Sequence, residues 1–204
     1  HESEGKMVLN NGRVPFIANW KGHWPEGEVE NALVSNIDMA PTIFEAAHVV
    51  PPPKMRVDGK SLFSLFDEDH NQWRKSLYLE ITYTRAVVTK DWKYIATRFP
   101  DSIQRKVNSS PPGTYTQEGS TSSAGAVHDV KVRYNANKLF PGYFDPDQLY
   151  HLTEDPNEQN NLAKKAEYKD QLQEMHNLLK NYCLELPHEF GEFTENRNEL
   201  YFKK

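Results

Sequence analysis

Short apolar runs alternate with turn-forming residues in the first third of the chain, as they do where strands and helices interleave in an α/β fold. Residues 14–20 form an apolar run that ends at a Lys-Gly pair and a Trp-Pro-Glu-Gly turn, which predicts a strand, and residues 32–35 predict a second short extended piece. From Asn36 or Asp38, either of which can cap a helix, the apolar spacing predicts a helix through residue 47. Three prolines at 51–53 end it, because the residue before a proline favours extended backbone.

The middle of the chain changes to the periodicity of strands. Residues 61–66 still have apolar positions with helical spacing and predict a short helical turn. From residue 76 onward apolar and polar residues alternate, which predicts a half-buried strand. The segments 85–89 and 92–97 flank Lys90-Asp91, a two-residue connection that suits an antiparallel hairpin.

The last part of the chain begins with a segment that lacks any apolar period. Residues 99–128 are rich in Ser, Gly and Pro, which predicts a long loop or insertion. Residues 148–152 predict a further strand, and residues 162–186 have the spacing of an amphipathic helix. The tail from residue 187 has no period, so we expect docking to order it.

Composition narrows the classes of protein to which this chain can belong. The 204 residues include 24 Lys plus Arg and 29 Asp plus Glu, with a formal net charge of −5, and the basic residues are scattered, so we expect no nucleic-acid partner. No apolar run approaches the length of a membrane-spanning helix. The single cysteine, Cys183, excludes an internal disulfide and is best interpreted as a small buried apolar residue. The chain starts His-Glu-Ser without Met, so we expect a fragment whose targeting signal is missing.

Four stretches carry a resemblance to a known family. In chain order they are GRVPFIANWKG at 12–22, SNIDMAPTI at 35–43 followed by DGKSL at 58–62, RAVVTKDWKYI at 85–95, and QLYHL through NLA at 148–163. Each is short, but together and in this order they resemble the carboxy-terminal portion of the type I, formylglycine-dependent sulfatases of the alkaline-phosphatase-like superfamily.

The resemblance implies a fold in two parts. Residues 1–70 would be the end of the α/β catalytic domain, with the last strand and helices of its mixed sheet. Residues 71–204 would be an α+β subdomain, in which a smaller antiparallel sheet packs on a carboxy-terminal helix and the long loop lies at 99–128.

The resemblance also implies a chemistry that this chain does not complete. Family members hydrolyse sulfate esters with a formylglycine made in a Cys/Ser-x-Pro/Ala-x-Arg motif and with a Ca²⁺ ion held by oxygen-rich side chains. No such motif occurs in the sequence. We therefore expect the nucleophile and the Ca²⁺ ligands to lie upstream, no metal site in this chain, and no activity from this chain alone.

Four residues are candidates for contact with the substrate. Lys6 matches, with a shorter spacing, the family lysine that contacts the sulfate; otherwise it is a solvated lysine. His23 follows the first strand in a turn and could touch a sugar ring or simply lie at the surface. Tyr83 and Arg85, at the hairpin entrance, are candidates for specificity, with support of the sheet edge as the alternative role. Asp38 is better explained as a helix cap than as a metal ligand.

The first reading is therefore a portion of a sulfatase acting on a sulfated carbohydrate or an aryl sulfate ester, with the remainder of the sulfatase chain as its partner. A second reading is a non-catalytic carbohydrate-binding module that uses Trp24, Tyr83 and Trp92. A third is a phosphoester hydrolase or mutase of the same superfamily. By resemblance, the location would be periplasmic, secreted or lysosomal.

Overall fold

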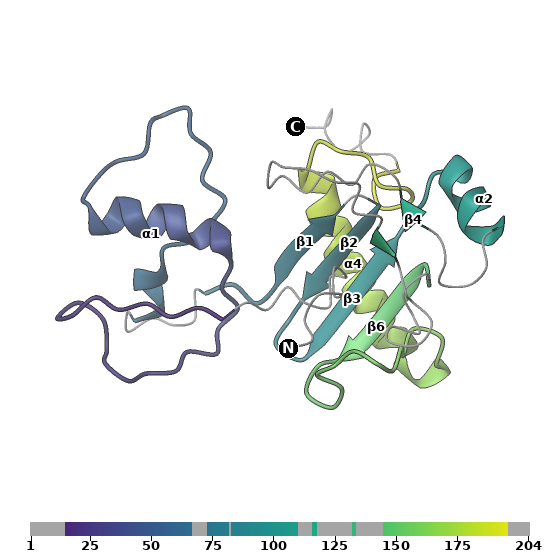
Figure 1. Ribbon diagram of the computed structural model, residues 1–204, viewed down its shortest axis with the longest axis horizontal. Coiled ribbons are helices and arrows are strands. Elements are labelled where there is room, and N and C mark those ends of the chain that lie inside the picture. Colours follow the sequence, from purple (N-terminus) through teal and green to yellow (C-terminus); the bar gives the residue numbers. More distant parts are fainter. Residues whose placement is uncertain are drawn as a thin grey trace. The chain divides into compact units, whose positions relative to one another are not determined.

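The computed structural model describes residues 15–66, 73–81, 83–109, 116–117, 132–133 and 145–195 (Figure 1). The chain divides into two compact units, which are described separately below. The helix–loop unit is Arg13–Leu77, and the sheet unit comprises His1–Gly12 and Tyr78–Lys204.

The helix–loop unit is built around one short helix. A 3₁₀ helix, Asn36–Asp38, leads directly into α1, Met39–Ala46, which confirms the predicted helix. His48 follows α1 with a positive φ of 53°, so the chain has left helical geometry before the prolines. A second 3₁₀ helix, Leu62–Leu65, confirms the predicted turn at 61–66.

The strand predicted at 14–20 is not found in its described part. Residues 15–20 have no regular structure, and neither do residues 32–35. A strand exists only through hydrogen bonds to a neighbouring strand, and no strand pairs with residues 15–20 within the described part of this unit. The side chain of Ile17 is 93% exposed, so apolar character alone did not place this segment in a core.

The sheet unit contains a four-stranded sheet in the order β1-β2-β3-β6. The strands are β1, Leu77–Ile81; β2, Thr84–Val88; β3, Trp92–Thr97; and β6, Asp147–His151. β3 pairs antiparallel with β2 and with β6. The predicted hairpin is confirmed: the Thr89 N–H donates to the Trp92 carbonyl at 2.8 Å and closes the Lys90-Asp91 turn.

The core of the sheet unit lies between the sheet and the long helix α4, Lys169–Glu185 (Figure 1). Its fully buried members include Val87, Tyr94 and Leu149 from the sheet and Met175 and Leu179 from the helix. Cys183 on α4 is buried among them, as predicted for a small apolar residue. Phe190 and Phe193 join the same cluster, so docking does order the described start of the tail.

Two elements differ from the prediction. The segment 99–128 contains a helix, α2, Asp101–Ser109, and a short strand, β4, Thr116–Gln117, which pairs with β5, Val132–Arg133. The Ser- and Gly-rich composition of the whole segment obscured the helix. α4 also begins later than predicted, after a 3₁₀ helix at Ala166–Tyr168. The Asn161 side-chain oxygen accepts hydrogen bonds from the N–H groups of Leu149 and Ala163, which hold this stretch beside β6 instead of in a helix.

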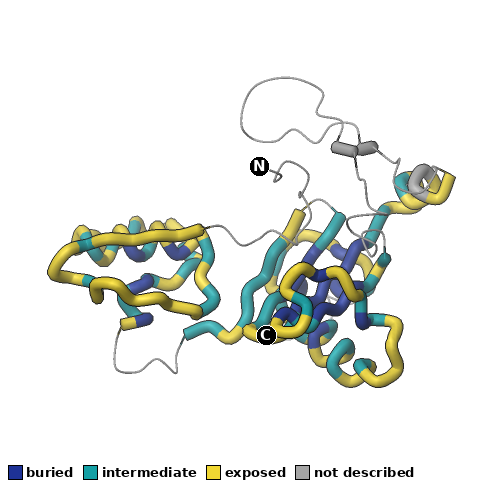
Figure 2. The backbone as a smooth tube through the Cα atoms, turned by 60° about the horizontal axis from the view of Figure 1, so that its bottom comes forward, coloured by how far each residue is buried: buried dark blue, intermediate teal, exposed yellow. Residues whose placement is uncertain are grey.

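The α+β arrangement of an antiparallel sheet packed on a carboxy-terminal helix is confirmed. The domain boundary near residue 70 stays a prediction, and the compact units separate after Leu77. Within the described parts of the chain, no helix is both long and apolar enough to span a membrane. Figure 2 shows that the buried residues concentrate in the strands and helix of the sheet unit, whereas exposed residues dominate the helix–loop unit.

Candidate functional site

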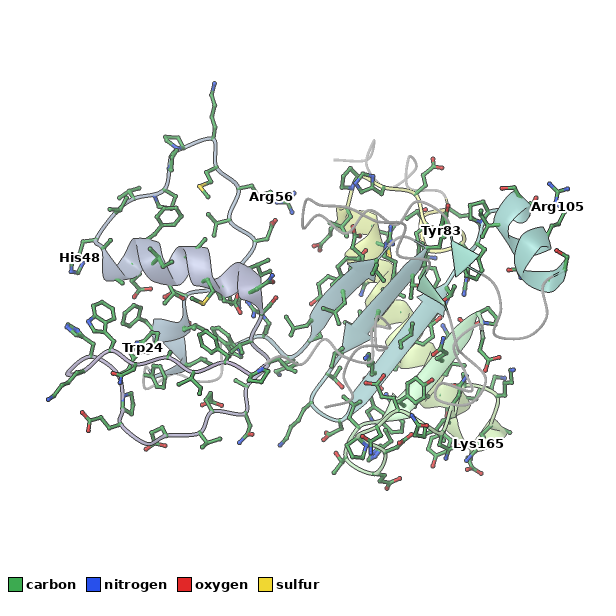
Figure 3. The ribbon with its side chains drawn as sticks, in the orientation of Figure 1. Trp24, His48, Arg56, Tyr83, Arg105 and Lys165 are labelled. Carbon is green, nitrogen blue, oxygen red and sulfur yellow. The ribbon has the colours of Figure 1, made fainter. Side chains whose placement is uncertain are left out.

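The predicted contact residue His23 lies in a turn and belongs to a cluster of aromatic rings in the helix–loop unit. Its ring centroid is 4.2 Å from that of Trp20, and Trp24 packs 5.6 Å from Phe63 and 6.0 Å from Phe66. Figure 3 labels Trp24 in this group. His23 itself is exposed, so its imidazole is accessible on this unit.

Tyr83 lies between β1 and β2 at the entrance of the hairpin, as predicted (Figure 3). Its half-buried ring packs edge-on against Phe99, with 5.7 Å between centroids. Its carbonyl accepts a hydrogen bond from the Arg98 N–H at 2.8 Å. These contacts fix the position of Tyr83 relative to the end of β3.

Arg85 is on β2, and its side chain is largely buried. The guanidinium lies 3.1 Å from the Glu80 carboxylate and 4.9 Å from the ring centroid of Phe190. The Tyr78 hydroxyl donates to the same carboxylate at 2.7 Å, and burial together with this bond raises the Tyr78 pKa. These contacts favour the alternative role of Arg85, support of the sheet, and its contact with substrate stays a prediction.

The four predicted contact residues therefore have different surroundings. Lys6 lies outside the described residues. His23 is in the helix–loop unit, whereas Tyr83 and Arg85 are in the sheet unit and pack against different neighbours. Their roles in binding remain predictions.

Asp38 does not cap α1 with its side chain, although it stands at the N-cap position. The carboxylate is fully buried and accepts hydrogen bonds from the backbone N–H groups of Ser35, at 2.7 Å, and Lys60, at 2.9 Å. Both of its oxygens also pair with the Arg74 guanidinium. The predicted capping role is confirmed for the 3₁₀ helix Asn36–Asp38, where the Asp38 carboxylate and Ser35 form a capping box. Its other partners, Lys60 and Arg74, are 22 and 36 residues away, and no local pattern reveals them.

The electrostatics of Asp38 follow from these partners. Burial by itself disfavours the charged carboxylate, but the hydrogen bonds from Arg74, Lys60 and Ser35 outweigh burial and lower the pKa below its ordinary value of 3.8. Asp38 is thus an anion that ties three segments of the helix–loop unit together.

The described residues do not fit the calcium ion that the resemblance implies. Across the parts of the chain that the structure describes, no three His, Cys, Asp or Glu side chains gather closely enough to hold a metal ion. The buried Asp38 carboxylate is bound by Arg74 and backbone N–H groups, so it has no open position for a cation. No catalytic step can be assigned to a metal on these residues.

Two further ionic groups were missed by sequence reasoning. Lys93 on β3 donates to both oxygens of Glu158, at 2.9 and 3.0 Å, and both side chains are buried. Glu158 has a positive φ of 56°, which is uncommon for a side chain of this size. The partners are 65 residues apart, so only the fold brings them together.

The second group ties the carboxy-terminal segment to the sheet. The Arg98 guanidinium pairs with Asp147 at 2.9 Å and holds Glu192 through two hydrogen bonds of 2.9 and 3.0 Å from Nε. The pKa of Glu192 is lowered because these bonds outweigh the opposing effect of burial. His176 on α4 packs 4.5 Å from the Phe193 ring, and burial lowers its pKa.

The chain is similar in sequence to a family model and to a curated protein. The family model for the carboxy-terminal region of N-sulphoglucosamine sulphohydrolase matches residues 5–103. An ulvan-active sulfatase from Formosa agariphila is 29% identical over 181 residues, which cover 83% of this chain and 33% of that protein. The chain therefore spans about a third of the length of this curated relative.

Solved structures are similar at lower identity. One, in complex with its substrate D-glucosamine-2-N,6-O-disulfate, is 22% identical with a TM-score of 0.44, covering 72% of this chain and 23% of the other. Another, from work on the metabolism of multiple glycosaminoglycans by Bacteroides thetaiotaomicron, is 21% identical with a TM-score of 0.46, covering 74% of this chain and 25% of the other.

Proposed function

We propose that the chain belongs to the sulfatases, that the complete polypeptide hydrolyses sulfate esters of a carbohydrate and that this chain supplies its carboxy-terminal part. A family model for the carboxy-terminal region of a sulfatase matches residues 5–103, and a curated sulfatase is 29% identical over 181 residues. The match to residues 5–103 carries the proposal, since it runs through the helix–loop unit and on into the hairpin of the sheet unit. Both the matched family and the curated relative are named for sulfated or glycan substrates, N-sulphoglucosamine and ulvan, which supports a carbohydrate over an aryl sulfate as the natural substrate.

In this proposal, residues outside this chain carry out the chemical step. The sequence has no Cys/Ser-x-Pro/Ala-x-Arg motif, and the described residues offer no cluster of metal ligands. A formylglycine nucleophile and a Ca²⁺ ion would therefore be supplied by the remainder of the polypeptide, and the 204-residue chain alone would be inactive.

Within the chain, Lys6 would contact the sulfate, and His23 and Tyr83 would contact the sugar. The accessible imidazole of His23, which packs against Trp20, supports this role. Arg85 is a further candidate for contact with the substrate. Its contacts with Glu80 and Phe190 favour the alternative role, support of the sheet.

The experiment compares the complete polypeptide with the 204-residue chain. Release of sulfate is measured from an aryl sulfate and from sulfated mono- and oligosaccharides, and release of phosphate is measured from an aryl phosphate. We expect sulfate release by the complete polypeptide only. Turnover by the 204-residue chain alone contradicts the division of labour, and release of phosphate in place of sulfate supports a phosphoester hydrolase.

Variants of the complete polypeptide test the individual residues. Lys6→Ala should lower kcat/KM by about 100-fold or more, because it removes a charged donor from the sulfate. Lys21→Ala, at an exposed lysine of the helix–loop unit, is the matched control.

His23→Ala should raise KM, with His48→Ala as its control. Arg85→Lys separates the two roles of Arg85: a lower melting temperature with unchanged KM indicates support of the sheet.

The carbohydrate-binding module is disfavoured by the positions of two of its three predicted aromatic residues. Tyr83 precedes the first residue pair of the β2–β3 ladder, and Trp92 follows the last. These positions are separated along the strand by roughly 20 Å, at about 3.3 Å per residue. Glycan binding by the 204-residue chain alone, lost in Trp24→Ala, would nevertheless restore this reading.

A further inference from the structure

The guanidinium of Arg98 joins three separate parts of the sheet unit. Arg98 directly follows β3, and its Nη2 lies 2.9 Å from an Asp147 carboxylate oxygen at the start of β6. Its Nε donates to both carboxylate oxygens of Glu192, at 2.9 and 3.0 Å, and its Nη1 donates to the carbonyl oxygens of Thr97 and Pro146. All three guanidinium nitrogens therefore have acceptors, and these bonds hold the planar group in one orientation.

Glu192 belongs to a carboxy-terminal segment that packs closely around this guanidinium. We name residues 190–194 the clamp segment (yellow in Figure 1). The ring of Phe193 is completely buried, and its centroid lies 5.2 Å from the guanidinium carbon. The Phe190 N–H donates to the Thr194 hydroxyl oxygen at 2.7 Å. Because this bond closes the segment on itself, the clamp segment has a defined shape where it meets the end of β3.

The main chain of Arg98 connects the clamp segment to the entrance of the hairpin. The Arg98 N–H donates to the Tyr83 carbonyl at 2.8 Å. The next residue, Phe99, packs edge-on against the Tyr83 ring, with 5.7 Å between the centroids. Tyr83 is thus held by its backbone at Arg98 and by its ring at Phe99. Tyr83 itself is half-buried, so part of this residue is open to solvent (Figure 3).

The charges around Arg98 favour a positioning role over direct contact with a sulfated substrate. One guanidinium faces two carboxylates, those of Asp147 and Glu192, so these three groups carry an excess of negative charge. This excess repels an anionic substrate. The nitrogens of the guanidinium are also already engaged in hydrogen bonds. Arg98 can therefore influence recognition of a sulfated sugar through Tyr83, which it holds in place.

We propose that Arg98 and Glu192 are positioning residues for Tyr83 and that the clamp segment thereby contributes to recognition of the sugar. This inference rests on the proposed function, because that function gives Tyr83 its contact with the sugar. A contact residue that is already held in its bound geometry loses less conformational entropy when the ligand binds. Loss of the clamp should therefore weaken binding of the sugar and leave the chemical step, which residues outside this chain carry out, unchanged.

The test is Glu192→Ala in the complete polypeptide, with Glu189→Ala as the matched control. The Glu192 side chain is 43% exposed, so its truncation is compatible with folding, and Glu189 is an exposed glutamate three residues earlier. Kinetics are measured with N-sulphoglucosamine, with sulfated ulvan oligosaccharides and with 4-nitrophenyl sulfate, which has no sugar.

The expected result is a change in KM that depends on the sugar. Glu192→Ala should raise KM for the sulfated saccharide by about tenfold and leave kcat within about twofold. Its kcat/KM for 4-nitrophenyl sulfate should stay within about twofold of wild type. An equal loss of kcat/KM on both substrates indicates a merely structural role, and a saccharide KM equal to that of Glu189→Ala indicates no role. Either result overturns the inference.

A double-mutant cycle shows whether Glu192 acts through Tyr83. Tyr83→Ala alone should raise KM for the saccharide. Glu192→Ala should then raise it by less than about twofold further, because the residue that Glu192 helps to position is already gone. Effects of the two substitutions that multiply would give Glu192 a separate role and overturn the inference.

Hydrogen–deuterium exchange of the complete polypeptide provides a readout that does not depend on turnover. The Arg98 amide, which donates to the Tyr83 carbonyl, should exchange at least about tenfold faster in Glu192→Ala than in wild type or Glu189→Ala. Equal exchange overturns the inference. If Glu192→Ala does not fold, Glu192→Gln, which keeps the size of the side chain and removes its charge, takes its place with the same expected directions.

One outcome separates this inference from the proposed function. Absence of sulfate release by the wild-type complete polypeptide contradicts the proposed function. The Kd for the ulvan oligosaccharide, measured by isothermal titration calorimetry, then replaces KM. A Kd raised about tenfold in Glu192→Ala, together with faster exchange of the Arg98 amide, retains the inference, and an unchanged Kd overturns it.

Discussion

The two units of this chain differ in which side chains they bury. In the sheet unit, side chains such as Tyr94, Leu149 and Leu179 are completely buried between the sheet and α4. Among the described residues of the helix–loop unit, the most deeply buried side chain is that of Asp38, and apolar side chains such as Ile17 and Val50 are exposed. The described interior of the sheet unit is therefore mainly apolar, whereas that of the helix–loop unit is centred on a buried carboxylate.

Among the described residues, each unit also contains a buried ion pair, and the two pairs differ in what they connect. Asp38 and Arg74 join segments that lie 36 residues apart in the sequence. Lys93 and Glu158 fasten a turn to β3, an inner strand of a sheet that already has an apolar core. Because removal of one partner strands a charge away from water, the first pair should matter more for the local structure of its unit.

The largest expected effect is that of Asp38→Ala on the helix–loop unit. It leaves the Arg74 guanidinium and the N–H groups of Ser35 and Lys60 without their acceptor, at a cost of about 3–5 kcal/mol. Exchange protection of the α1 amides should be lost. Asp58→Asn is the control, because the Arg56–Asp58 pair is mostly exposed and contributes about 1 kcal/mol or less. Equal exchange in the two variants would refute the role given to Asp38.

The next effect belongs to the core of the sheet unit. Leu179→Ala should lower the free energy of unfolding by about 2–5 kcal/mol, since the side chain is completely buried and its removal leaves a cavity. Urea unfolding followed by circular dichroism measures it. Ile43→Ala in the same 204-residue chain should change the free energy by about 0.5 kcal/mol or less. Similar losses for the two variants would abolish the contrast between the units.

A smaller effect is expected at Gly59, where two backbone segments meet. A Cβ atom at this position would lie 2.1 Å from the Ile37 carbonyl oxygen, so the Gly59→Ala chain must shift the segment that carries Asp38. We expect a loss of about 3 kcal/mol, seen as faster exchange of the α1 amides. Gly22→Asn is the control, because Gly22 has open space around it and asparagine tolerates its positive φ of 79°. Unchanged exchange in Gly59→Ala would show that this contact is not formed.

The smallest effect is a difference in acid sensitivity. His176 in the sheet unit has a folded-state pKa below its ordinary value of 6.5, so the unfolded chain takes up its proton first and the unit loses stability as the pH falls below about 6.5. The stabilising contribution of Asp38 in the helix–loop unit persists until the pH falls below 3.8, toward its lowered pKa.

His176→Phe tests this difference, because it keeps a ring against Phe193 and removes the titrating group. The melting temperature of the sheet unit should then fall less between pH 7 and pH 5 in the variant than in the wild type, because residue 176 no longer takes up a proton. An identical pH profile in wild type and variant would assign the acid sensitivity to other groups.

Local patterns in the sequence were sufficient for the regular elements of the sheet unit. The alternation at Leu77–Ile81, the Lys90-Asp91 turn and the helical spacing in α4 each predicted an element that the structure contains. These patterns predict their elements reliably because each element is determined by residues that are neighbours along the chain. The strand expected at 14–20 shows the opposite case, because a strand also needs a partner that no local pattern supplies.

For the candidate site, the sequence nominated Lys6 through its resemblance to a family lysine, and His23, Tyr83 and Arg85 through their places in a turn and at the entrance of the hairpin. It could not show that Arg85 packs on Phe190 or that His23 packs against Trp20, since these contacts depend on side-chain geometry.

By itself, then, the sequence determined the hairpin, the long helix and the resemblance to a family, because periodicity, turn residues and the order of motifs are written along the chain. The tertiary structure alone decided that Asp38 binds Arg74, that Arg98 holds Glu192 and that α1 turns its apolar face outward. These features join residues as many as 94 positions apart, and the choice between a buried and an exposed face is made by packing, which no local pattern of residues encodes.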